Sequence, residues 1–269
     1  MRVLKYIALA AAAFAALACG KHMVDFNGDS ATDKAMLKIL YFEPIDKIPD
    51  NAMDSVYIND VRVSGTLWVY NQVPSFYRFF AVSPGAVNIK LFRGAEQDGS
   101  SRLVYERDVT IDAGRWQVAV YDLNNDPFIL DDDYPYPNHS SGGDPATFNT
   151  DSLVSYRFLN VVYQSPGVPY QGKLQYQYMP KHDNTWHDLG EPVGFGEQTA
   201  RVSVAIHKTD FNSSGSERVE FRCVDPETGQ FVAKTSDYWN GYIGRAYTHI
   251  LRGCLTGSPI AHYTQFTCL

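Results

Sequence analysis

The stretch PGAVNIKLF at residues 84–92 decides the fold class, because a turn dipeptide leads directly into a strand-type segment. Its apolar residues Val87, Ile89 and Leu91 alternate with polar ones, which is the period-two pattern of a strand with one buried face. The Pro-Gly pair before them supplies the backbone dihedrals of a tight turn. A half-buried antiparallel strand is therefore expected here.

Six further segments of the same kind lie between residues 36 and 122. Most breaks between them contain Gly, Pro, Asn or Asp, which are turn-forming residues. The expected strands are 36–42, 55–63, 66–70, 76–82, 103–110 and 115–122. About seven short strands in roughly 90 residues are typical of an immunoglobulin-like sandwich.

The strand pattern stops near residue 131 and resumes near residue 151. Residues 131–150 are acidic and rich in Pro and Gly, which cannot join a sheet interior, so they are predicted to form an interdomain linker. Strands are expected again at 155–162, 173–179, 200–206, 217–223, 231–235 and 245–252. The sequence thus predicts an all-β chain with two tandem immunoglobulin-like β-sandwich domains, at 36–130 and 151–269, and few helices.

The two halves resemble a diverged repeat. Residues 87–91 (VNIKL) alternate as residues 202–206 (VSVAI) do. Near the end of each half, 103–109 followed by 115–120 parallels 231–237 followed by 245–250. A shared topology of the two domains is therefore expected.

Residues 1–18 have the three parts of a secretory signal peptide: a positive start, an apolar run at 7–17, and small residues before the cut. The run is shorter than the roughly 20 residues that span a bilayer. Cys19 follows directly and is the residue that a lipoprotein signal would present for acylation. Ala16-Leu17-Ala18 also fits an ordinary secretory site, so plain secretion remains the alternative to lipidation. Residues 19–35 are polar and are predicted to form a tether.

Charge limits the partners of the mature chain. Loss of residues 1–18 lowers Lys+Arg from 23 to 21 against 30 Asp+Glu, so the net charge changes from −7 to −9. An acidic chain argues against a nucleic-acid partner and against electrostatic binding to anionic lipid. The membrane is then reached through the lipid on Cys19, which predicts an outer membrane-anchored protein on the periplasmic or cell-surface side.

Three cysteines remain after Cys19, too few for a disulfide-rich scaffold. A Cys254–Cys268 disulfide would fix the C-terminal segment, and the sequence leaves it open whether that bond forms. Cys223 falls in the middle of an expected strand and is predicted to be a small core residue.

Two polar clusters contain metal-ligand residue types. HDNTWHD at 182–188 holds two His and two Asp that could bind Zn²⁺ or Ca²⁺, but a polar hairpin loop explains it better. Asn124-Asn125-Asp126 and Asp131-Asp132-Asp133 are rich in oxygen ligands, yet they lack the EF-hand pattern and favour a solvated spacer. No metal site and no cofactor are therefore predicted.

The chain also lacks the motifs of the common enzyme classes: a G-x-S-x-G elbow, H-E-x-x-H, a P-loop or G-x-G-x-x-G. We predict that it is not an enzyme. The aromatic residues Trp186, Trp239 and Tyr242 are the candidate ligand-binding residues, with core packing as the alternative for each.

Several segments resemble a known family. LKILYFEP (37–44), DSVYIND (54–60) and YRFFAVSPG (77–85) are similar to the opening strands and turns of domain of unknown function 4397, and YRFLN (156–160) restarts the pattern. QYQY (175–178) has lost the Asp and Asn-Gly of the family's second strand. The resemblance implies tandem β-sandwich domains in an exported, Bacteroidetes-type lipoprotein, and it implies no catalytic residues.

These observations predict a cell-envelope lipoprotein that acts as a non-enzymatic interaction or structural module in adhesion or surface assembly. The alternative is a glycan-binding lipoprotein that serves polysaccharide capture. Aromatic side chains that lie about 5–10 Å apart on one face, the rough spacing of neighbouring sugar rings, would favour the glycan alternative.

Overall fold

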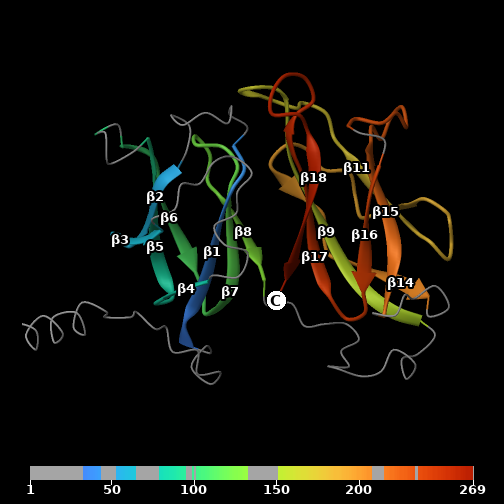
Figure 1. Cartoon of the computed structure of the whole chain (residues 1–269), viewed down its shortest axis with the longest axis horizontal. Coiled ribbons are helices and arrows are strands. Elements are labelled where there is room, and N and C mark those ends of the chain that lie inside the picture. The colour runs from blue at the N-terminus through green and yellow to red at the C-terminus, as the bar shows by residue number, and fades with distance from the viewer. Residues whose placement is uncertain are drawn as a thin grey trace, which may run out of the picture.

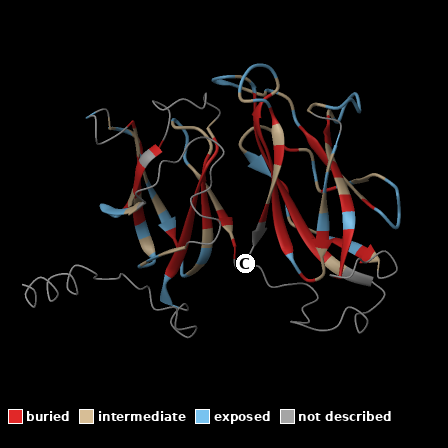
Figure 2. Ribbon diagram, viewed as in Figure 1, coloured by how far each residue is buried: buried red, intermediate tan, exposed pale blue. Residues whose placement is uncertain are grey.

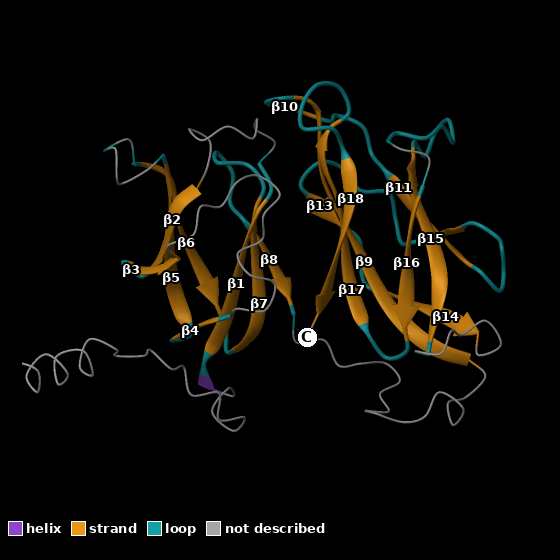
Figure 3. Cartoon of the chain, viewed as in Figure 1, coloured by secondary structure: helices purple, strands orange, loops and turns teal. Residues whose placement is uncertain are grey.

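The computed structural model describes residues 33–43, 53–64, 79–94, 99, 101–132, 151–207, 215–233 and 236–268. Within these ranges the chain forms strands β1 to β18 in four sheets, which confirms the all-β fold (Figures 1 and 3). No described helix is long and apolar enough to cross a membrane. Cys19, the signal peptide, residues 20–32 of the predicted tether and the predicted strand at 66–70 lie outside the described residues. The predicted end of the tether at residue 35 is wrong, because Ala35 is buried and begins the first strand.

The first half builds two four-stranded sheets. One has the order β4-β1-β7-β8 and the other has the order β3-β2-β5-β6. Their bounds are β1 Ala35–Tyr41, β2 Met53–Ile58, β3 Val61–Ser64, β4 Phe80–Val82, β5 Gly85–Arg93, β6 Arg102–Ile111, β7 Gly114–Val120 and β8 Phe128–Asp131. The alternating residues quoted above for 84–92 form β5, and their apolar members face the core between the sheets.

The second half also builds two sheets. One has the order β10-β9-β17-β18, with β13 and β14 also paired to β9, and the other has the order β12-β11-β15-β16. Their bounds are β9 Asp151–Ser165, β10 Val168–Pro169, β11 Gln175–Pro180, β12 His187–Asp188, β13 Glu197–Gln198, β14 Val202–His207, β15 Ser216–Val224, β16 Asp237–Tyr242, β17 Ala246–Cys254 and β18 His262–Cys268.

The two halves share one topology. In each, the first strand pairs in parallel with a late strand, β1 with β7 and β9 with β17, and the remaining neighbours are antiparallel. Sheet order makes β5 equivalent to β15 and β4 equivalent to β14. The predicted match of 87–91 with 202–206 is therefore wrong, because period-two alternation is common to all half-buried strands and does not identify equivalent ones.

The four sheets stack as layers, and the inner two pack face to face. Three apolar clusters fill the spaces between successive layers, and the middle cluster joins the two halves (Figures 1 and 2). Strands β1 and β17 are consequently buried along their whole length. We call the middle cluster the seam; it consists of Leu40, Phe42, Ala119 and Leu130 from the first half and Leu159, Val161, Ile250 and Phe266 from the second.

Hydrogen bonds add to the seam where β8 ends. The guanidinium groups of Arg157 and Arg201 both donate to the carbonyl oxygen of Asp131, at 2.7 and 3.2 Å. Asp132 is fully buried and accepts a 2.6 Å hydrogen bond from the Gln117 amide. The prediction of a solvated spacer is wrong for these two aspartates, because they continue β8 into the seam. Residues 133–150, most of the predicted linker, lie outside the described part of the chain.

The strand register rules out the Cys254–Cys268 disulfide. Cys268 lies opposite Ala246, whereas Cys254 is at the other end of β17. Eight residues of strand separate the two positions by about 26 Å, and a disulfide needs Cα atoms closer than about 7 Å. Cys223 is buried in the core, as predicted, and burial raises the pKa of its thiol.

Candidate functional site

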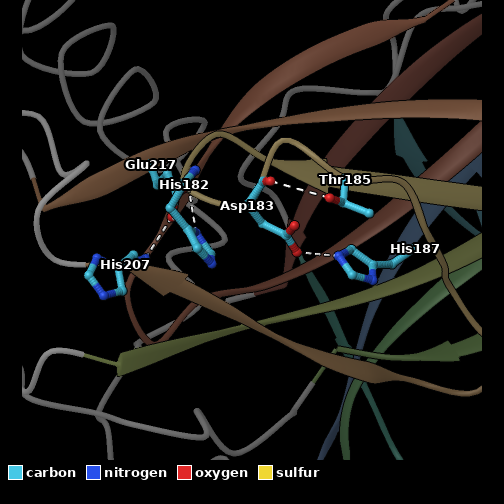
Figure 4. Close-up of polar contacts among 6 residues, drawn as sticks. All are labelled: His182, Asp183, Thr185, His187, His207 and Glu217. Atoms are coloured by element: carbon cyan, nitrogen blue, oxygen red, sulfur yellow. Dashed lines mark hydrogen bonds and ion pairs between the residues drawn. The ribbon is translucent and has the colours of Figure 1, made fainter.

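The turn between β11 and β12 carries the histidine- and aspartate-rich segment (Figure 4). The carboxylate of Glu217, which is fully buried on β15, accepts hydrogen bonds from the backbone N–H groups of His182 and His207 at 2.7 and 2.6 Å. The Nδ1 atom of His182 lies 2.9 Å from the same carboxylate. Glu217 therefore holds this turn and the end of β14 together.

The other members of the turn also pair with one another. His187 Nε2 forms a short hydrogen bond with the carboxylate of Asp183. Hydrogen bonds from Thr185 and then from His187 lower the pKa of Asp183. Across the described ranges, no group of three or more His, Cys, Asp or Glu side chains is placed to hold a metal ion. The arrangement is that of a hairpin turn whose polar groups satisfy each other.

The structure separates the three predicted ligand-binding aromatics. Trp239 points inward from β16 and packs on Phe221 and His249, with ring centroids 5.9 and 4.8 Å apart. Tyr242 is half-buried at the end of the same strand beside Arg245. Trp186 lies on the opposite, outer face of the sheet. The core alternative is thus correct for Trp239, and Trp186 remains a surface candidate.

The outer face of the β12-β11-β15-β16 sheet carries two arginine–aromatic stacks. Val219, Phe221 and Cys223 point into the core, so Arg218, Glu220 and Arg222 between them point outward. We call the set Trp186, Arg218, Arg222, Phe231 and Tyr238 the arginine–aromatic face.

The stacks bring charge and ring surface together on this face. The guanidinium of Arg222 lies 4.0 Å from the ring centre of Trp186 and 5.4 Å from that of Phe231. The guanidinium of Arg218 lies 3.7 Å from the ring centre of Tyr238. Phe231 and Tyr238 are 49% and 54% exposed, so solvent reaches large aromatic surfaces beside both cations. Such contacts are favourable for arginine and hold the rings in place.

A chain of hydrogen bonds fixes the orientation of Arg222. Its Nε donates to the side-chain oxygen of Gln177 at 2.7 Å, and the Gln177 amide donates to Asp188 at 2.7 Å. Burial lowers the pKa of Arg222, and the charge of Asp188 opposes that shift. The guanidinium stays protonated at neutral pH, because arginine titrates only at far higher pH.

Arg218, Arg222 and Phe231 were not among the predicted site residues, although Arg222 contacts Trp186 and Phe231, and Arg218 contacts Tyr238. The alternation of Arg218, Glu220 and Arg222 with apolar residues does indicate an outward polar row on β15. The neighbours of that row come from β16 and from the segments before β12 and after β15. Their identity depends on strand order, which alternation does not give.

A second polar group that sequence analysis missed lies inside the sandwich. His249 is fully buried; the Tyr176 hydroxyl donates to its Nδ1 at 2.7 Å, and its Nε2 donates to the side-chain oxygen of Gln265 at 2.8 Å. Burial lowers the pKa of His249 to about 3, against a smaller opposing effect of Gln265. The rings of Phe221 and Trp239 enclose the imidazole, so its role is structural.

Comparison with known proteins gives no family and no curated relative. No protein-family model matches the sequence, and no curated protein matches it. Among solved structures, the chain is similar to a crystal structure of a proposed cell adhesion protein from Bacteroides ovatus ATCC 8483, at 7% identity. The alignment covers 86% of this chain and 95% of that one, with a TM-score of 0.22, too low to carry an argument about function. The resemblance to domain of unknown function 4397 stays a prediction.

Proposed function

We propose that this chain is an outer membrane-anchored lipoprotein that acts as a non-enzymatic interaction module in adhesion or surface assembly. In this proposal the arginine–aromatic face is the surface that contacts a partner protein. The observation that carries it is the pair of exposed arginine–aromatic stacks on one sheet face. Trp, Tyr and Arg are the residues most enriched among the hot spots of protein–protein interfaces.

The geometry favours a protein partner over a stacked sugar chain. Arg218 and Arg222 are four residues apart on β15, which puts their stacks about 13 Å apart along the strand. That distance between the two stacks exceeds the rough 5–10 Å expected for neighbouring sugar rings. Within one stack, the rings of Trp186 and Phe231 both contact Arg222 and so lie within about 10 Å of each other, but the charged guanidinium that both rings contact is typical of a protein interface. Trp186 and Trp239 lie on opposite faces of the sheet and form no common platform.

The layer order also supports this assignment. The seam occupies the inner face of each half, which leaves the outer face of the last sheet uncovered by any other described strand. The predicted anchor, Cys19, precedes the first half, whereas the arginine–aromatic face belongs to the second. A partner could therefore reach the last sheet without disturbing the packing between the halves.

Anchorage is tested by Cys19→Ser. We expect the variant to move from the membrane fraction to the soluble fraction and to lose labelling by a fatty-acid analogue, because no other side chain replaces the acylated thiol. Fractionation and click-labelling of wild type and variant measure both effects. A variant that stays membrane-bound would show that the anchor is elsewhere.

The contact surface is tested by combining Trp186→Ala, Arg222→Ala and Tyr238→Ala in the soluble, mature protein. Loss of hot-spot residues worth at least about 2 kcal/mol is expected to weaken binding to envelope preparations of the native host by about thirtyfold or more. Sedimentation of labelled protein with the preparation measures the affinity.

The matched control replaces Arg102 and Leu103 by alanine on β6, in the outer sheet of the first half, and should bind as wild type does. Equal binding by face variant and control would refute the contact surface. Binding that survives protease but not periodate treatment of the envelope would assign the partner to glycan instead.

A further inference from the structure

Part of the Arg222 guanidinium has no hydrogen-bond partner among the residues that the structure describes. Its Nε is bound by Gln177, whereas no described carboxylate forms an ion pair with the group and no described acceptor takes its two Nη groups. The neighbouring cation differs, because Arg218 already pairs with Glu220 at 2.9 Å. The face therefore holds one oriented cation with unused donors.

The surroundings hold that guanidinium in a single orientation. Trp186 and Phe231 contact it through their rings, and the Asp188–Gln177–Arg222 hydrogen bonds set its rotation. A side chain fixed before binding loses little conformational entropy when a ligand arrives. The planar fork of arginine matches the two oxygens of a carboxylate, which lysine does not.

We infer that Arg222 is the centre of a carboxylate-binding subsite, and that it receives a Glu or Asp side chain of a partner protein. The inference rests on the proposed function and adds the chemistry of the contact. The two Nη groups donate to the carboxylate oxygens, while the exposed ring of Phe231 is covered by apolar atoms next to that carboxylate.

The charges around Arg222 favour a ligand with one negative charge over a ligand with two. Asp188 accepts a hydrogen bond from Gln177, and its negative charge offsets part of the positive charge of Arg222. The charge of Arg218 is balanced by its ion pair with Glu220. A phosphate, with close to two negative charges, would meet one unpaired cation beside two carboxylates. A single carboxylate balances Arg222 without excess negative charge.

The test is an NMR titration of the ¹⁵N-labelled mature protein with a hexaglutamate peptide. The Arg222 Nε–H and the Trp186 indole N–H, the latter assigned with Trp186→Phe, should shift in a saturable manner, and a hexaglutamine peptide should cause no such shift. Raising the salt concentration should weaken the binding, because part of the interaction is between exposed charges.

Variants of Arg222 and Gln177 distinguish the contribution of the planar guanidinium geometry from that of the positive charge. Arg222→Lys keeps the positive charge but loses the planar guanidinium, and it is expected to weaken hexaglutamate binding at least tenfold. Gln177→Leu removes the hydrogen bond that orients the guanidinium, and it is expected to weaken binding several-fold. Arg102→Lys on β6 is the matched control and should leave the titration unchanged.

Three results would overturn the inference. Absence of a saturable shift with hexaglutamate would show that Arg222 does not bind carboxylates. An unaltered titration in Arg222→Lys would show that the two-donor geometry of arginine is not needed for binding. Tighter binding of hexagalacturonate than of hexaglutamate would reassign the subsite to an acidic glycan. The proposed function is judged separately by envelope binding of the triple variant, so either proposal can fail alone.

Discussion

Ile250→Asp is expected to lower the free energy of unfolding by about 4 kcal/mol, because it puts an unpaired carboxylate into the seam. Ile250 is fully buried on β17 and faces Leu40, Phe42 and Leu130 of the first half within one apolar cluster. Urea denaturation measures the loss. Hydrogen exchange should show that strands of both halves, such as β5 and β15, lose protection together in wild type and separately in the variant.

Leu103→Asp is the control for this experiment, since Leu103 is 46% exposed on the outer sheet of the first half. A change within about 0.5 kcal/mol is expected there. If Ile250→Asp unfolds no more easily than Leu103→Asp, the two halves do not depend on the seam.

Acidification should destabilise the second half through His249. The folded-state pKa of His249 is about 3, whereas the unfolded imidazole titrates near 6.5, so the unfolded chain binds the proton first as the pH falls. The contribution of neutral His249 to the free energy of unfolding is fully present above about pH 6.5, and it is lost progressively as the pH falls toward 3. The expected loss is about 2 kcal/mol at pH 5 and about 4 kcal/mol at pH 3.

His249→Leu isolates this contribution. The variant should be less stable at neutral pH by about 2 kcal/mol, since the Tyr176 hydroxyl and the Gln265 amide each lose a partner. Its stability should fall less steeply between pH 6.5 and 4 than that of wild type. Chemical denaturation at a series of pH values gives both curves; parallel curves would mean that His249 is not buried as a neutral group.

Alternation predicted most of the described strands, because each half-buried strand alternates by itself. It did not predict β8, β16 or β18, and the expected strand at 231–235 is wrong, since Phe231 forms only an isolated bridge and residues 232–233 belong to no strand. It did not predict the seam, because burial on both faces depends on which sheets stack. Strand β1, AMLKILY, carries Lys38 at a position that is 3% exposed, and β17 carries His249 and Arg252 in a fully buried strand. Such polar residues suggest a solvated face when the strand is considered alone.

The prediction of the site residues failed for the same reason, because the sequence does not give the order of the strands. Trp186, Trp239 and Tyr242 are aromatic candidates from the second half of the sequence, yet Trp239 faces the core and Trp186 the outer face. Cys254 and Cys268 are likewise close in sequence, whereas their strand register separates them. Pairing and register are set by contacts between distant segments, so a local pattern cannot supply them.

The most direct test of the proposed contact surface is site-specific photo-crosslinking in cells. A photoreactive amino acid at Tyr238, in the arginine–aromatic face, is compared with the same group at Leu103, on the outer sheet of the first half; both positions are exposed. The proposal predicts a discrete, protease-sensitive crosslinked species from position 238 that disappears when Trp186→Ala and Arg222→Ala are added. Equal crosslinking from positions 238 and 103, or a species that persists in that variant, would contradict it.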